Sequence, residues 1–222
     1  MLLLAIDTSG KHGSIALARC GPGDACDVLE VVPLVGGTFS AQLVPQIAEL
    51  LKKHGFTKHD LGGLAAASGP GSFTGLRVGL AAIKALAEAL EKPIATVSLL
   101  KAVAVAGKRE SKLYAALDAG RGEIYVGEYE RGQLTAFGER LMTREEFLAS
   151  CRDWMVVSPD PPIAEAAQKV GADSIVIQRP RSDAIARLGW KRLQAEQTVA
   201  PEELEANYIR RSDAEIFSKT GL

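Results

Sequence analysis

The chain contains 222 residues, with 26 basic and 27 acidic side chains and a formal net charge of −1 at pH 7. This near-neutral balance excludes a protein that coats nucleic acid through a clustered basic excess. Hydrophobic residues make up 47% of the chain and charged residues 24%, which excludes a mainly disordered protein and predicts one large domain or two small ones.

In chain order, short apolar runs bounded by turn residues predict strands, and apolar residues spaced three and four apart predict helices. The first half predicts strands at 2–6, 14–19, 28–34, 61–68 and 93–97, and helices at 40–54, 76–90 and 98–106. The second half predicts strands at 113–117, 122–129, 134–141, 154–158 and 174–178, and helices at 143–150, 161–170, 182–196 and after Asp213. Ser40 is the expected N-cap of the first helix, and Thr143 with Glu146 matches a capping box.

One pattern occurs twice, about half the chain apart. A strand that ends in Asp7 leads through a tight turn into a second strand, and the same order recurs around Asp118. The repeat predicts an α/β fold of two related lobes, each with a three-stranded meander followed by crossover units. We expect the first lobe at residues 1–108 and the second at 109–222, whose last segment is a candidate to pack back on the first lobe.

Cysteine usage and hydropathy predict where the protein works. Cys20, Cys26 and Cys151 have no metal-type spacing and are expected to be reduced thiols in a cytosol. The apolar run at the start stops at Asp7, which is too short for the core of a signal peptide, and no stretch approaches ~20 apolar residues. We therefore expect a soluble, cytoplasmic protein with no membrane contact.

The most distinctive motif is the glycine-rich segment 69–79, which lies between a predicted strand and a predicted helix. It is neither a Walker A loop nor a dinucleotide-binding fingerprint. One interpretation is a residual nucleotide or phosphate loop at the start of the helix, formed by Asp7, Thr8, Ser9, Gly69, Gly71, Ser72, Thr74 and Gly75. The alternative is a tight turn with Thr74 as N-cap and glycines that permit close packing.

Candidates for catalysis are few. Asp7 and Asp118 stand where two-lobed sugar-kinase and actin-like folds keep acidic residues facing a metal-bound nucleotide, but an aspartate at a strand end is also a common turn former. Ser72 lacks the context of a nucleophile elbow, and the chain has neither a His-Glu-x-x-His nor a Cys-x-x-Cys motif. We predict no catalytic residue and no metal ligand. The basic residues near the end of the sequence are interpreted as a solvated helix face, with an RNA or partner contact as the alternative.

The predicted helices at 40–54 and 76–90 are candidates for a contact between subunits. The second has small residues at helical spacing, which would let another helix approach closely. Packing inside the lobe is the alternative. The candidate interface residues are Ser40, Leu43, Val44, Ile47, Arg77, Leu80, Ala82, Ala85 and Ala89.

Four motifs resemble those of one known family. They are Leu4–Ser9, the glycine motif Gly69–Gly79, Asp118–Arg121 with Glu123–Tyr125, and Asn207–Arg210. In this order, over nearly the whole chain, they are similar to the TsaB (YeaZ) family. The resemblance implies the two-lobed sugar-kinase/actin-like fold, called ASKHA and related to ribonuclease H.

The resemblance also implies a function. A TsaB-type chain is a non-catalytic paralogue of TsaD, and supports threonylcarbamoyl transfer to the adenosine next to the anticodon of tRNAs that read ANN codons. The implied partners are the TsaD-type catalytic subunit, which carries ATP and a divalent metal, the TsaE-type ATPase, and tRNA through the complex. This chain would bind no cofactor, would dock to TsaD through helices of the first lobe, and would form a homodimer when alone.

Two positions depart from the family pattern. Phe39 stands where many members have a histidine, and Ala119-Gly120 stands where many have Ala-Arg. The alternative function is an active ATP-dependent phosphotransferase or ATPase of the same fold, with Asp7 and the 69–75 loop binding a magnesium nucleotide.

Overall fold

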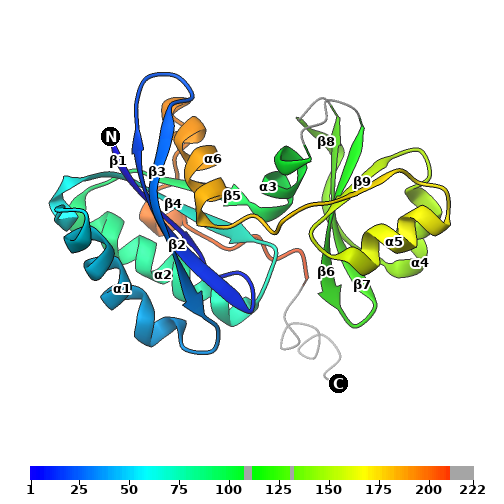
Figure 1. Ribbon diagram of the computed structural model, residues 1–222, viewed down its shortest axis with the longest axis horizontal. Coiled ribbons are helices and arrows are strands. Elements are labelled where there is room, and N and C mark those ends of the chain that lie inside the picture. Colours follow the sequence, from blue (N-terminus) through cyan, green and yellow to red (C-terminus); the bar gives the residue numbers. More distant parts are fainter. Residues whose placement is uncertain (108–111, 131–132, 211–222) are drawn as a thin grey trace. The chain divides into compact units, whose positions relative to one another are not determined.

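The computed structural model describes residues 1–107, 112–130 and 133–210, which belong to two compact units (Figure 1). The first unit contains residues 1–99 and 180–207. The second contains residues 100–179 and, among those described, 208–210. Within the described part, no helix combines the length and the apolar character needed to cross a bilayer.

The first unit is built on a five-stranded sheet in the order β3-β2-β1-β4-β5. Its strands are β1 (Leu2–Asp7), β2 (His12–Cys20), β3 (Cys26–Val35), β4 (Leu61–Gly69) and β5 (Ile94–Ser98). The first three form an antiparallel meander, whereas β4 and β5 run parallel to β1. Every residue of β1 is buried, as expected for a central strand covered on both faces.

Helices cover both faces of this sheet (Figure 1). Leu4 and Ile6 of β1 share one apolar core with α1 (Phe39–Lys53) and α2 (Phe73–Leu90). On the other face, α6 (Ser182–Gln194) approaches so closely that a Cβ at Gly189 would lie 2.5 Å from the Cβ of Ala65 in β4. Successive side chains along the strands point to opposite faces of the sheet and so contact different helices.

The second unit repeats the topology of the first, with a sheet in the order β10-β9-β6-β7-β8. The first three strands in sequence again form an antiparallel meander, and the last two run parallel to the first of them. This confirms the predicted pair of related α/β lobes. The strands are β6 (Leu113–Gly120), β7 (Glu123–Glu130), β8 (Gln133–Thr143), β9 (Met155–Ser158) and β10 (Ser174–Val176).

The boundary between the units differs from the predicted division at 108/109. Helix α3 (Leu99–Ala106) follows β5 but packs on the second sheet, where a Cβ at Gly127 would lie 3.1 Å from the Cβ of Leu100. Helix α6 follows β10 but packs on the first sheet. The segment after α6 stays with the first unit, because Val199 N–H donates to the carbonyl of Ile94. Helices α3 and α6 thus each cover a sheet other than the one that contains the preceding strand.

The remaining helices are α4 (Arg144–Ser150) and α5 (Pro161–Lys169), with short 3₁₀ turns η1 (Lys58–Asp60) and η2 (Pro201–Glu203). The capping box is confirmed, since Thr143 and Glu146 bond each other's backbone N–H. The predicted caps of α1 and α2 are wrong: Thr38 and Ser72 occupy these positions, and α2 begins three residues before the predicted Leu76. The helix predicted after Asp213 lies outside the described residues.

Candidate functional site

The glycine motif connects β4 to α2 and lies directly against the turn that follows β1. Ser72 N–H donates to the carbonyl of Ser9 at 2.6 Å, and the Thr8 hydroxyl donates to the carbonyl of Gly75 at 2.8 Å. Ser72 also caps α2, because its hydroxyl accepts from Gly75 N–H at 3.2 Å. Polar groups of the two segments therefore satisfy one another.

Glycines are required here because the two backbones touch. A Cβ at Gly71 would lie 2.3 Å from the carbonyl oxygen of Ser9, and one at Gly75 would lie 2.1 Å from that of Thr8. At Gly79, one turn further along α2, a Cβ would lie 2.3 Å from the hydroxyl oxygen of Thr8. Of the two interpretations of the motif, this geometry is that of a tight turn with glycines for close packing, capped by Ser72 rather than Thr74.

Asp7 organises the turn on the β1 side. The side chain is buried, and its Oδ1 accepts from the backbone N–H of Ser9 at 2.9 Å and from the Ser9 hydroxyl at 2.5 Å. Both are local bonds of the kind by which aspartate stabilises a turn. The structure thus brings Asp7, Thr8 and Ser9 together with Gly71 and Gly75, as the sequence predicts. Hydrogen bonds within and between the two segments hold them together.

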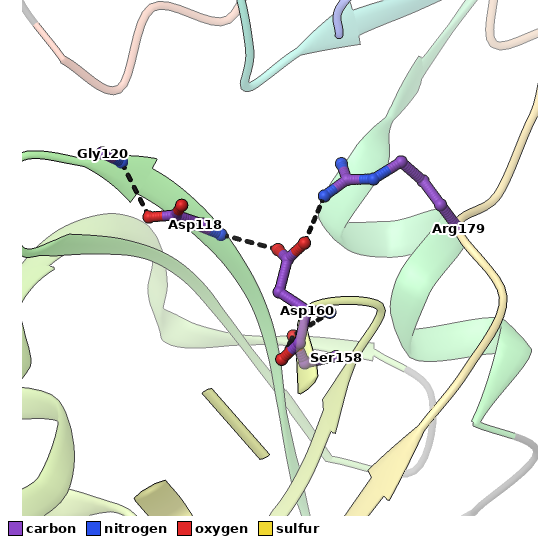
Figure 2. Close-up of polar contacts among 5 residues, drawn as sticks. All are labelled: Asp118, Gly120, Ser158, Asp160 and Arg179. Atoms are coloured by element: carbon purple, nitrogen blue, oxygen red, sulfur yellow. Dashed lines mark hydrogen bonds and ion pairs between the residues drawn. The ribbon is translucent and has the colours of Figure 1, made fainter. Parts of the chain in front are cut away.

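Asp118 has the equivalent position in the second unit (Figure 2). Its Oδ1 accepts from Gly120 N–H at 2.8 Å, again as a turn former, and its own N–H donates to Oδ2 of Asp160 at 2.9 Å. Asp160 in turn pairs with Arg179 at 2.7 Å, and its N–H donates to the Ser158 hydroxyl at 3.1 Å. The carboxyl ends of β6 and β9 are therefore joined by a carboxylate that has a cationic partner.

An open cavity of about 490 Å³ adjoins the glycine motif. Three residues of the predicted phosphate loop line it, namely Ser72, Thr74 and Gly75. The rest of the wall comes from Gly10, Lys11, His12, Val35, Gly36, Gly37, Phe39, Ser40 and Val78. Phe39 is buried beside Gly13, where a Cβ would lie 2.9 Å from its ring, so this side chain is part of the apolar core. Among the described residues, no group of three His, Cys, Asp or Glu side chains has the arrangement of a metal site.

Burial divides the predicted interface residues of α1 and α2 into three sets. Leu43, Ile47 and Leu80 are wrong as contact residues, because their side chains are buried in the core of the first unit. Ala82 is partly buried against the same core. The exposed members are Ser40, Val44, Arg77, Ala85 and Ala89.

Four further exposed residues were not predicted from the sequence. Ala41, Pro45 and Ala48 lie with Val44 on the solvent side of α1, and Ala81 lies with Ala85 and Ala89 on that of α2. Their positions are three or four residues apart, which places each set on one side of its helix. The sequence does carry a signal for these residues. A second stripe, made of small residues, runs along each helix beside the stripe of Leu and Ile. We call these seven residues the outer helical face: Ala41, Val44, Pro45, Ala48, Ala81, Ala85 and Ala89.

The motif at 207–210 has a structural role in both units. Asn207 N–H donates to the carbonyl of Ser68 in the first unit. In the second unit, Arg210 pairs with Glu123 and donates to the carbonyl of Ala119 at 2.9 Å. Other basic residues near the end of the sequence are also paired, since Lys191 bonds Asp24 at 2.8 Å. Some of the basic residues near the end of the sequence therefore form ion pairs and hydrogen bonds within the protein.

Comparisons with known proteins agree with the motifs. The family model described as TsaD, tRNA N6-adenosine threonylcarbamoyltransferase, matches residues 31–191. The chain is 30% identical to the tRNA threonylcarbamoyladenosine biosynthesis protein TsaB of Bacillus subtilis (strain 168). The match extends over 209 residues and covers 92% of this chain and 85% of that protein.

The fold is shared with solved structures. A Pseudomonas aeruginosa protein with similarity to peptidase YEAZ superposes with a TM-score of 0.75 at 26% identity, over 94% of this chain and 99% of that chain. A ROK family protein from Streptococcus pneumoniae TIGR4 has a TM-score of 0.51 at 11% identity, over 89% of this chain and 99% of that chain, and shows the fold alone. The chain belongs to the TsaB (YeaZ) family and has the two-lobed ASKHA fold.

Proposed function

We propose that this chain is a non-catalytic scaffold subunit for threonylcarbamoyl transfer to the adenosine next to the anticodon of ANN-decoding tRNAs. Its role is to bind and support a TsaD-type catalytic subunit. Membership of the TsaB family supports the pathway, since the relatives carry the name of tRNA threonylcarbamoyladenosine biosynthesis. The model of the catalytic family also matches most of the chain, as expected for a paralogue of the enzyme.

The observation that carries the non-catalytic assignment is the packing of the glycine motif. Here the carbonyl oxygens of Thr8 and Ser9 occupy the space beside Gly75 and Gly71, and the Asp7 carboxylate is bonded to Ser9. ATP and the divalent metal then belong to the TsaD-type subunit, and this chain binds no cofactor.

The outer helical face is the proposed docking surface. Alanine, valine and proline side chains on two neighbouring helices let the helices of a partner approach closely, without desolvation of charges. Val44 is 64% exposed, and a partner bound to this face would cover it. The same face would pair with a second copy of the chain when TsaD is absent. The TsaE-type ATPase and tRNA then join through the complex.

The test is size-exclusion chromatography with light scattering on the full chain, alone and mixed with the TsaD-type subunit of the same organism. We expect a one-to-one complex that replaces any homodimer, and Ala85→Arg should abolish both associations while the circular dichroism spectrum is unchanged. Gln168→Arg, on the exposed side of α5, is the matched control and should associate normally.

Independent elution of the two chains at micromolar concentration, with and without nucleotide, would refute docking. Calorimetric titration of the chain alone with magnesium ATP tests the alternative of an active ATPase. It should give no heat of binding. Binding that Asp7→Asn removes would favour the alternative.

A further inference from the structure

Two cysteines face each other at the end of the β2–β3 hairpin. Cys20 and Cys26 are cross-strand partners, and the N–H and C=O of Cys20 both bond to the backbone of Met1 on the β1 side, at 2.8 and 2.6 Å. On the β3 side the pair is therefore a non-hydrogen-bonded pair, in which Cα atoms are about 4.5 Å apart and side chains are closest. This spacing falls at the near end of the range that a disulfide requires, about 4.4–6.8 Å.

The two thiols are already in contact but differ in access. Their Sγ atoms are 3.1 Å apart, and Cys20 donates its S–H toward Cys26. Cys20 is buried at 3% exposure, whereas Cys26 is half-buried and reachable from solvent. Burial and the neighbouring thiol raise the pKa of Cys20 to about 12, so this group is a protonated thiol at neutral pH. Such an arrangement has one sulfur that an external reagent reaches and one that lies behind it.

We propose that Cys20 and Cys26 are a reversible modification site, which forms an intramolecular disulfide by exchange with a low-molecular-weight disulfide. The Cys26 thiolate attacks one sulfur of the reagent, which releases the first reagent thiolate and leaves a mixed disulfide on Cys26. Cys20 then gives its proton to the released reagent thiolate, and the Cys20 thiolate attacks the Cys26 sulfur and releases the second reagent thiolate. Two protein thiols and one reagent disulfide become one protein disulfide and two reagent thiols.

The disulfide would close the tip of the hairpin, which is the part that α6 holds. Trp190 Nε1–H donates to the Gly23 carbonyl at 3.0 Å, Lys191 pairs with Asp24 at 2.8 Å, and Arg187 donates to the Cys26 carbonyl at 2.7 Å. Because the sulfurs meet without movement of the strands, oxidation should preserve these contacts and restrict the unfolded chain. The thermal midpoint of unfolding should rise by about 5 °C on oxidation and return on reduction.

The experiment incubates the full-length protein with oxidised glutathione, quenches with acid, and maps thiols by maleimide labelling and mass spectrometry after unfolding. We expect the wild type to lose two free thiols, to carry no stable glutathione and to yield a peptide linked through Cys20 and Cys26. Cys151→Ser should behave in the same way. Cys20→Ser should accumulate glutathione on Cys26, because the second step is missing.

Two results would overturn the proposal. One is a wild type that holds glutathione on Cys26 as stably as Cys20→Ser does, because Cys20 then fails to capture the mixed disulfide. The other is a wild type that keeps all three thiols under conditions in which Cys20→Ser becomes glutathionylated. Cys26→Ser checks the assigned order, since buried Cys20 should then react at least tenfold more slowly than Cys26 does in Cys20→Ser.

Discussion

Thr8 and Gly75 fasten the start of α2 to the end of β1. The Thr8 hydroxyl donates to the Gly75 carbonyl at 2.8 Å, and the Thr8 carbonyl oxygen lies 2.1 Å from the position that a Cβ on Gly75 would take. Residues separated by 67 positions in sequence thus lie in backbone contact. This contact explains the glycine motif as a packing device.

Replacement of Gly75 by alanine should destabilise the first unit. The added methyl group meets a backbone oxygen that cannot move without disturbing β1, and such overpacking costs about 2–3 kcal/mol of unfolding free energy. Gly10→Ala is the matched control in the same region, because its Cβ would meet only ordinary contacts at 3.5 Å or more. Urea unfolding followed by Trp190 fluorescence, in a Trp154→Phe background, measures both, and equal midpoints would contradict the packing role.

Replacement of Gly189 by alanine tests the assignment of α6 to the first unit. The new methyl group would lie 2.5 Å from the Cβ of Ala65, and we expect a net loss of about 1–2 kcal/mol after the better helix propensity of alanine is included. Because Trp190 lies in the first unit and Trp154 in the second, the two fluorescence signals distinguish the units. Only the transition reported by Trp190 should shift. Gln194→Ala, at an exposed position of α6, should leave both transitions in place.

Loss of the Asp160 carboxylate should weaken the second unit. Asp160→Ala removes the acceptor for Asp118 N–H and the partner of Arg179, which together are worth about 1–2 kcal/mol. Asp160→Asn keeps an acceptor and loses only a partly exposed ion pair, so its cost should be about 0–1 kcal/mol. Trp154 fluorescence during urea unfolding, in a Trp190→Phe background, checks the order. Equal effects of the two variants would show that charge rather than hydrogen bonding matters here.

The capping box of α4 should make stability depend on pH. The Thr143 backbone N–H, and then its hydroxyl, hold the pKa of Glu146 below the ordinary value of 4.5. A carboxylate with a lowered pKa in the folded state stabilises the protein above its unfolded pKa, and this contribution is lost as pH falls through the folded pKa.

Glu146→Gln retains an acceptor but cannot titrate. Its thermal midpoint should therefore lie below that of the wild type near pH 7, and the difference should shrink toward about pH 3. Scanning calorimetry over this range measures the difference. A gap that stays constant with pH would contradict the assignment to the Glu146 carboxylate.

Local sequence patterns determined the elements of this protein. The apolar runs around Asp7 and Asp118, the helical spacing after Ser40 and the capping box at Thr143 each specify their structure through neighbours within a few residues. For this reason the strands, the helices and the repeated lobe were predictable. The glycine motif also marked the place where two backbones meet, and the TsaB-type motifs identified the family.

Only the tertiary structure decided which sheet each helix covers and which side chains remain exposed. Helices α3 and α6 are amphipathic, but their own sequences do not specify which sheet has the complementary face. The close packing of Gly189 against Ala65, for example, joins residues that lie far apart in sequence. Likewise, the helical pattern of α1 does not separate Leu43, which is buried, from Val44, which is exposed, until a core is placed on one side. Contacts between residues far apart in sequence carry this information, and they exist only once the sheets have formed.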